Sequence, residues 1–153
     1  MTTSRLLSAT FITGIAAAAI EMVFVLPIQA AMGNSPLIVF QSIASGATGM
    51  AAYGGGIGSA LQGVGWHVLI SLVSALAYIL AATRMRFLYV RPLIGGVLCG
   101  VVAYVVMNWI VIPLSAIGYH PASKPELVLL SFAIHLIGFG IPIAYVARAT
   151  ARR

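Results

Sequence analysis

Long apolar stretches dominate the chain and recur four times between short polar connections. A membrane-spanning helix needs about 20 apolar residues, because each residue advances the helix by about 1.5 Å through roughly 30 Å of hydrocarbon. All four stretches reach that length. We therefore predict an all-α polytopic membrane protein, one helical-bundle domain over residues 1–153 whose transmembrane helices cover residues 6–27, 57–83, 92–113 and 127–147.

A fifth uncharged segment, residues 36–53, shows a different pattern. Ser35 followed by Pro36 is typical of an N-cap and the first residue of a helix, and three consecutive glycines follow the segment. Its polar side chains recur at i, i+4 and i+7, along one helix face. They are Gln41, Ser45 and Thr48. The segment is predicted to form a short amphipathic helix that lies at the outer interface or re-enters the bundle.

Composition supports a membrane protein over a soluble domain. Hydrophobic residues make up 61% of the chain and charged residues only 7%, against about a quarter charged residues in ordinary soluble domains. The net charge of +6 would suggest nucleic acid if it formed a surface patch, but the basic residues stand at the ends of apolar stretches. We expect the lipid bilayer as partner, and no nucleic acid.

The basic residues also predict the orientation, because short cytoplasmic loops are enriched in arginine and lysine. With four spans, every arginine lies on one side and Lys124 on the other. The arginines are Arg5, Arg84, Arg86, Arg91, Arg148, Arg152 and Arg153. Counting residues 36–53 as a fifth span would divide them between both sides. The sequence predicts that both termini are cytoplasmic.

The first stretch also resembles a secretory signal peptide, because Arg5 and the small residues 16–19 flank an apolar run. The apolar run continues beyond Glu21 to residue 26. We therefore expect an uncleaved first span. Cleavage would leave three spans in the same orientation.

Each predicted span contains one strongly polar residue well inside its apolar run. These residues are Glu21, His67, Asn108 and His135. At about 1.5 Å per residue, they lie roughly 8 to 15 Å below the outer ends of their spans. A charge inside a bilayer costs at least about 2.5 kcal/mol, so such side chains usually face the bundle interior and find partners. These depths would allow the four to meet in one layer. Glu21 is expected to pair with His67 or His135, or to stay protonated, and such a pair could exchange a proton near neutral pH.

The candidate site also includes Gln41, Ser45 and Gln62. If the outer helix folds inward, its polar residues Gln41 and Ser45 would close the layer from above. A binding site or proton relay is one interpretation of the layer. The alternative is structural, since polar residues in spans often only form hydrogen bonds between helices, at about 0.6 kcal/mol each. Two histidines and a carboxylate could also bind a metal, but no local spacing is typical of a metal site, and none is expected.

A haem-binding interpretation uses His67 and His135 as the two axial ligands. It is supported only by their similar depth, so the expectation is that the protein has no cofactor. No nucleotide-binding, metalloprotease or hydrolase motif occurs. The sequence favours a small transport or proton-relay module, or an accessory subunit, over an enzyme. A purely structural subunit is the main alternative, and a haem- or quinone-binding redox protein is the third.

Small residues spaced four apart predict close helix packing, either within the chain or in a homo-oligomer or larger membrane complex. The pairs are Gly54 with Gly58, Gly96 with Gly100, and Gly14 with Ala18. In the last span, Pro142 follows two nearby glycines and predicts a kink.

Two segments carry a resemblance to a known group of proteins. Residues 39–49 (VFQSIASGATG) and 107–116 (MNWIVIPLSA), together with the two histidine-bearing spans, resemble a family of small bacterial inner-membrane proteins with a domain of unknown function. The resemblance covers nearly the whole chain. It implies a location in the bacterial cytoplasmic membrane, but it assigns no functional residues.

Overall fold

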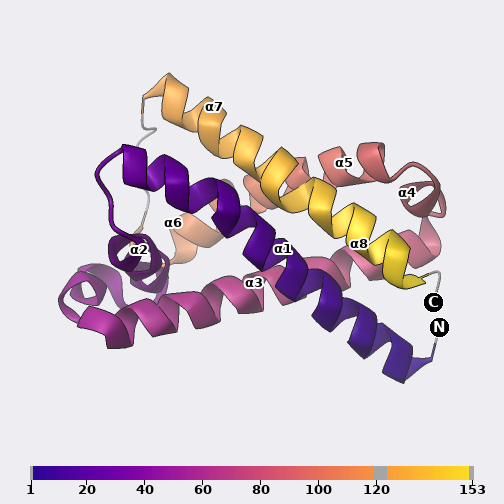
Figure 1. Ribbon diagram of the computed structural model, residues 1–153, viewed down its shortest axis with the longest axis horizontal. Coiled ribbons are helices and arrows are strands. Elements are labelled where there is room, and N and C mark those ends of the chain that lie inside the picture. Colours follow the sequence, from indigo (N-terminus) through magenta and orange to yellow (C-terminus); the bar gives the residue numbers. More distant parts are fainter. Residues whose placement is uncertain (1, 119–123, 152–153) are drawn as a thin grey trace.

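The computed structural model describes residues 2–118 and 124–151, and every regular element in these ranges is a helix. Four continuous helical stretches are long and apolar enough to cross a membrane. They are Thr3–Ala31, Gly56–Arg84, Pro92–Leu114 and Pro125–Ala151. Both chain ends lie at the same end of the bundle (Figure 1), as an even number of spans requires. The predicted all-helical class is confirmed. The four candidate spans are confirmed as helices of sufficient length and apolar composition.

Helix α1 (Thr3–Ala31) is longer than the sequence predicts at both ends. It begins at Thr3, where the Arg5 N–H donates to the hydroxyl of the N-cap Thr2 at 3.4 Å. The expectation that Pro27 ends the helix is wrong, because α1 continues for another turn. A proline inside a transmembrane helix is tolerated, since neighbouring groups satisfy the freed backbone carbonyl. The chain turns only at Gly33, whose φ of 86° suits glycine.

The short helix expected over residues 36–53 is divided in two. Helix α2 (Pro36–Thr48) begins with the predicted cap, in which the Ile38 N–H donates to the Ser35 hydroxyl at 3.4 Å. It ends because Gly49 adopts a φ of 62°, and a 3₁₀ helix, η1 (Gly49–Gly54), follows. In Figure 1, α2 is seen nearly end-on beside the first turns of α3. A short outer helix therefore exists, and its position at an interface or inside a membrane remains a prediction.

Helix α3 (Gly56–Arg84) packs against both α1 and α2. At its contact with α2, a Cβ on Gly63 would overlap the Phe40 carbonyl. At its crossing with α1, a Cβ on Gly14 would lie only 2.8 Å from the Leu72 Cα. Both contacts require glycine, because the two backbones approach without an intervening side chain.

The second half of the bundle is built from two interrupted helices. The first consists of α5 (Pro92–Val106), the π-helical turn η2 (Met107–Val111) and α6 (Ile112–Leu114), and it follows the short helix α4 (Phe87–Val90). The second consists of α7 (Pro125–Ile134), the π-helical turn η3 (His135–Gly140) and α8 (Ile141–Ala151).

Each π-helical turn ends just before a proline, Pro113 after η2 and Pro142 after η3. A proline ring clashes with the carbonyl four residues earlier, and widening the preceding turn relieves that clash. The sequence predicts a kink around Pro142, and the structure has a π-helical turn just before it; the kink itself stays a prediction.

Glycines join these two helices closely. A Cβ on Gly96 would lie 2.6 Å from the Ile141 Cα, and one on Gly100 would lie 2.6 Å from the Leu136 Cα. The predicted packing role of Gly96 and Gly100 is confirmed within the chain. The pair Gly54 and Gly58 differs, because an added Cβ at either position would have no heavy atom within 4 Å among the described residues.

The buried positions are mostly small, and the large apolar side chains point outward. Ala17, Ala44, Ala75 and Ala144 are fully buried, whereas large apolar residues such as Val23 and Leu129 are more than two-thirds exposed, at 69% and 68%. A bundle that presents its large apolar side chains outward suits a lipid environment, because helix contacts in membranes favour small residues.

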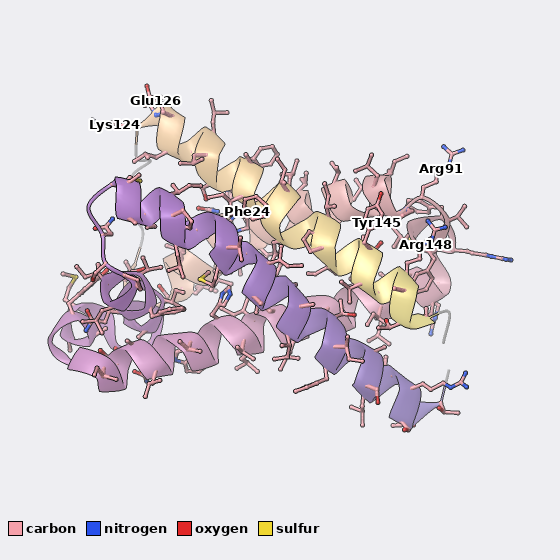
Figure 2. The ribbon with its side chains drawn as sticks, in the orientation of Figure 1. Phe24, Arg91, Lys124, Glu126, Tyr145 and Arg148 are labelled. Atoms are coloured by element: carbon pink, nitrogen blue, oxygen red, sulfur yellow. The ribbon has the colours of Figure 1, made fainter. Side chains whose placement is uncertain are left out.

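Charged side chains are separated between the two ends of the bundle. Arg91 and Arg148 lie at the end that also carries both termini, and Lys124 and Glu126 lie at the opposite end (Figure 2). This separation is the one the sequence predicts for these residues, although Arg152 and Arg153 fall outside the described residues. Which end faces the cytoplasm remains a prediction.

Candidate functional site

Glu21 of α1 and His67 of α3 lie together between these two helices. The Oε2 atom of Glu21 is 3.9 Å from the Nε2 atom of His67, and the two side chains are only 13% and 11% exposed. That separation is within ion-pair range but longer than a hydrogen bond. A small side-chain rotation would bring the carboxyl and the imidazole into direct contact.

The backbone of α1 fixes the orientation of the imidazole. The Nε2 atom of His67 lies 3.1 Å from the carbonyl oxygen of Ala18. A carbonyl can only accept, so Nε2 carries a hydrogen and donates it. Ala18 precedes Glu21 by three residues on the same helix face. The imidazole N–H therefore points at a region that contains both the carbonyl and the carboxyl group.

Both residues lie deep within their helices. Glu21 is about 15 Å along the axis from the end of α1 nearest α2, and His67 is about 17 Å from the corresponding end of α3. The carboxyl and the imidazole thus lie at the similar depth that the sequence predicts. A proton has two places to reside in this pair, on the carboxyl group of one helix or on the imidazole of the other.

His135 belongs to a different group of contacts. It begins the π-helical turn η3, and its Nδ1–H donates to the Ser131 carbonyl of its own helix at 2.8 Å. The ring packs edge-on against Tyr104 of α5, with centroids 5.5 Å apart. Among the described residues, His135 forms no hydrogen bond or ion pair with Glu21 or His67. A glycine of η3, Gly138, does approach the backbone of Glu21.

Asn108 lies in the other π-helical turn and also bonds to its own helix. Its side-chain amide donates to the Tyr104 carbonyl at 2.9 Å. Tyr104 therefore lies between Asn108 and His135, touching one through its carbonyl and the other through its ring. The four predicted residues form two separate groups, Glu21 with His67 and Asn108 with His135 around Tyr104.

Gln41 and Ser45 of the outer helix are buried, whereas Thr48, the third residue of the predicted polar face, is exposed. The amide of Gln41, which is only 3% exposed, donates to the Gly56 carbonyl at 3.1 Å and to the Ser59 hydroxyl at 3.3 Å. Ser59 in turn donates to the Ala52 carbonyl at 2.6 Å. This network ties α2 and η1 to the start of α3, about 12 Å along the α3 axis from His67. Gln41 thus stabilises the outer end of the bundle.

Ser45 and Gln62, the other two residues of the predicted site, do not take part in this network. Ser45 is buried, and its hydroxyl donates to the Ser42 carbonyl of its own helix at 2.7 Å. Gln62 is exposed on the outer surface of α3 and forms no hydrogen bond with another described side chain. Neither contacts Glu21 or His67 through a hydrogen bond in the described part of the chain.

Several hydroxyl groups that are buried or half-buried on α1 and α3 were not anticipated from the sequence. Ser71, one turn after His67, donates to the His67 carbonyl at 2.9 Å. Thr13 is fully buried, and its hydroxyl and that of Thr10 have no hydrogen-bond partner among the described residues. Helical spacing in the sequence could have indicated these groups. Thr10 and Thr13 are one turn apart, and Ser71 is one turn from His67.

Metal and haem binding were also considered from the sequence. Within residues 2–118 and 124–151, no group of three His, Cys, Asp or Glu residues is close enough to hold a metal ion. The imidazoles of His67 and His135 contact different neighbours, Ala18 and Glu21 for the first and Ser131 and Tyr104 for the second. A haem or quinone between these histidines remains a prediction from sequence alone.

Comparison with known proteins does not assign the chain to a family. No family model, curated protein or solved structure matches the chain. The resemblance to small bacterial inner-membrane proteins therefore remains an expectation based on the two sequence segments.

Proposed function

We propose that this chain is a small polytopic protein of the bacterial cytoplasmic membrane in which Glu21 and His67 bind and pass on a proton. Such a protein would act as a proton-relay or small transport module, or as an accessory subunit that supplies this step to a larger complex. Both termini would face the cytoplasm, because the arginines gather at their end of the bundle.

The observation that carries the proposal is the 3.9 Å approach of Glu21 and His67 between two candidate spans. Ionisable groups are costly inside a membrane and usually mark a functional path or a specific pairing. Here the partners are a carboxyl and an imidazole, the two side-chain types that most readily transfer protons near neutral pH. Because Nε2 of His67 already carries a hydrogen, the step that balances starts from a doubly protonated His67 and an ionised Glu21. Loss of the Nε2 proton to the carboxylate leaves a neutral imidazole protonated on Nδ1 and a neutral carboxyl group, and it moves a proton from α3 to α1.

Polar groups on either side of the pair support a path. Towards the α2 end, Ser59 of α3 is buried and accepts a hydrogen bond from the buried Gln41 of α2. Towards the end with the termini, Thr13 lies next to Gly14, which packs directly on Leu72 of α3. An unpartnered buried hydroxyl costs about 1 to 3 kcal/mol. The hydroxyl of Thr13 therefore suits a passing proton carrier such as water.

A flux measurement tests the proposal. The purified protein would be placed in lipid vesicles that contain a pH-sensitive dye, and an imposed membrane potential would drive proton movement. Wild-type protein should acidify the vesicles faster than empty vesicles, and Glu21→Gln and His67→Gln should each remove that difference. Glu126→Gln is the matched control, because Glu126 is the only other acidic residue and lies exposed at the bundle end.

A second measurement separates a relay from a structural pair. Infrared difference spectra recorded over a range of pH should contain a carboxyl band that disappears in Glu21→Gln and shifts in His67→Gln. Unchanged flux and an absent Glu21 band in a folded protein would contradict the proposal.

A second candidate function, a structural subunit of an oligomer or larger membrane complex, is favoured by one face of α3. Gly58 and Gly65 are exposed, with no heavy atom within 4 Å of an added Cβ among the described residues, and Gln62 is exposed between them. Such a face permits close approach of another helix and offers an amide as hydrogen-bond partner. Energy transfer between labelled copies in vesicles would detect association, and Gly65→Leu and Gln62→Leu should weaken it.

A further inference from the structure

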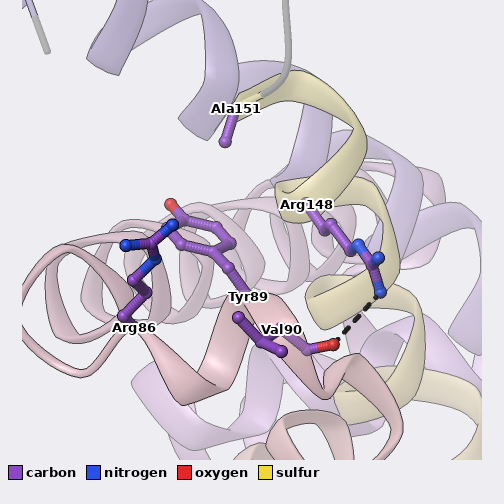
Figure 3. A pocket seen from close by; sticks show the side chains of 5 residues that line it. All are labelled: Arg86, Tyr89, Val90, Arg148 and Ala151. Atoms are coloured by element: carbon purple, nitrogen blue, oxygen red, sulfur yellow. Dashed lines mark hydrogen bonds between the residues drawn. The ribbon is translucent and has the colours of Figure 1, made fainter.

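An open hollow lies between the α3–α5 connection and the end of α8. Arg86, Tyr89, Val90, Arg148 and Ala151 line it, and its volume is about 400 Å³. Figure 3 shows Arg86 and Arg148 on opposite sides of Tyr89 and Val90, with Ala151 across from them. Two guanidinium groups from distant parts of the sequence therefore border one hollow at the end of the bundle that carries both termini.

These guanidinium groups have no acidic side chain to balance them. The whole sequence contains only two acidic residues, Glu21 and Glu126. Glu21 is buried beside His67 in the middle of α1, and Glu126 lies at the opposite end of the bundle from Arg148 (Figure 2). No acidic side chain of the chain is therefore available to balance Arg86 and Arg148.

The hydrogen-bonding capacity of the hollow is also largely unused. A guanidinium group has five N–H donors, and with the described residues Arg148 forms one hydrogen bond, a long one of 3.5 Å to the Val90 carbonyl. Tyr89 offers its hydroxyl as a further donor, and partial burial raises the pKa of Tyr89 above its ordinary value, so this hydroxyl stays protonated at neutral pH. Several donors thus border the hollow, and no carboxylate side chain pairs with them in residues 2–118 and 124–151.

Apolar side chains next to the hollow point to a lipid as the source of the anion. Phe87, Val90 and Tyr145 are 45%, 59% and 50% exposed, and Tyr145 lies one turn before Arg148 on α8. The hollow is also at the ends of helices that are long and apolar enough to span a membrane, where headgroups lie. A free anion would use the arginines alone, whereas a phospholipid would use both the arginines and this apolar rim.

We infer that this hollow binds the phosphate group of an anionic phospholipid, with Arg86 and Arg148 as its charged contacts and the apolar rim against its acyl chains. Basic pockets at the ends of transmembrane helices are typical sites for anionic headgroups, and arginine pairs well with phosphate oxygens because its donors are planar and paired. Arginine and a phosphodiester both stay charged across the physiological range. Binding should therefore be nearly constant between about pH 6 and pH 9.

Lipid titration of the wild-type protein provides the first test. Detergent-solubilised protein would be titrated with short-chain phosphatidylglycerol, phosphatidylcholine of the same chain length, or glycerol 1-phosphate, and the unfolding midpoint would be measured. Native mass spectrometry would count bound lipids. Phosphatidylglycerol should raise the unfolding temperature until the effect saturates, and mass spectrometry should detect one bound lipid per protein molecule. Phosphatidylcholine and glycerol 1-phosphate should have little effect.

Variants locate the site. Arg86→Gln with Arg148→Gln should weaken phosphatidylglycerol binding about tenfold or more, because each arginine near a headgroup contributes substantially to attraction. Arg5→Gln is the matched control, since Arg5 is an exposed arginine in the first turn of α1 and does not line the hollow. Arg86→Lys with Arg148→Lys should retain an intermediate affinity, which also shows that the chain folds without these arginines.

Three outcomes would overturn the inference. Equal stabilisation by phosphatidylcholine would show that headgroup charge is irrelevant. Equal stabilisation by glycerol 1-phosphate would indicate a soluble anion rather than a lipid. An equal loss of affinity in Arg5→Gln would indicate general attraction to the basic end instead of a site in the hollow.

Discussion

The two polar groups inside the bundle satisfy their hydrogen bonds in opposite ways. Glu21 and His67 face each other across the contact between α1 and α3, and His67 also donates to the α1 backbone. Asn108 and His135 instead each donate to a carbonyl four residues earlier in their own helix. The first group holds two helices together, whereas the second stays within single helices and surrounds Tyr104.

This difference shows that depth in a span does not determine what a polar residue does. Removing one partner of a pair between helices leaves the other partner buried and unsatisfied, which is costly. Removing a side chain that bonds its own backbone leaves only a carbonyl that the helix already uses. We therefore expect substitutions in the two groups to have different energetic consequences, even where the residues have similar polarity.

The largest effect is expected from separating α1 and α3. Gly14→Leu places a side chain where the Leu72 backbone lies, so it should lower the free energy of unfolding by about 3 kcal/mol or more and part Glu21 from His67. Unfolding of the protein in mixed micelles would measure this change. Gly58→Leu, on an open face of α3, is the control and should change little. Equal effects of the two substitutions would mean that the crossing is not as close as described.

An intermediate effect is expected from the energetic coupling between side chains. In a double-mutant cycle, Glu21→Ala and His67→Ala should show a coupling energy of about 0.6 to 1.7 kcal/mol, the range of polar pairs in membranes. Glu21→Ala and His135→Ala should show a coupling near zero, because no hydrogen bond or ion pair joins these two side chains in the described part of the chain. Unfolding of the four proteins of each cycle provides the values. Strong coupling to His135 would place all four polar residues in one cluster and would contradict the two-group description.

The smallest effect is expected for Asn108. Asn108→Leu removes an amide that bonds only the Tyr104 carbonyl, and it adds an apolar side chain to a partly exposed position. The free energy of unfolding should therefore change by less than about 0.5 kcal/mol, and proton flux should match the wild type. A large loss of stability would show that this amide has a partner on another helix.

Sequence patterns predicted most of the architecture. The four apolar stretches, the cap at Ser35 and the close packing at Gly96 and Gly100 are all present in the structure. Helix ends were less predictable, because Pro27 lies within α1 rather than at its end. A proline only removes local hydrogen bonds, so whether a helix stops there depends on what surrounds it.

The candidate site was only partly predictable. Counting residues from helix ends brought Glu21 and His67 to a similar depth, and the structure places them 3.9 Å apart. The same counting also suggested that His135 and Asn108 would join them. It could not include the rotation of each helix about its own axis, and in the structure these two side chains bond to their own helices and lie beside Tyr104 instead.

Some sequence features determine structure locally, along one helix at a time. These are the length of apolar stretches, the positions of proline and glycine, and the placement of arginines. For this reason the sequence by itself determined the number of candidate spans, the short helix after the first one and the gathering of positive charge at one end. The partner of each polar side chain depends on helix rotation and on the distance between backbones. These were decided only by tertiary packing, because contacts such as Gly14 against Leu72 determine which faces of two helices meet.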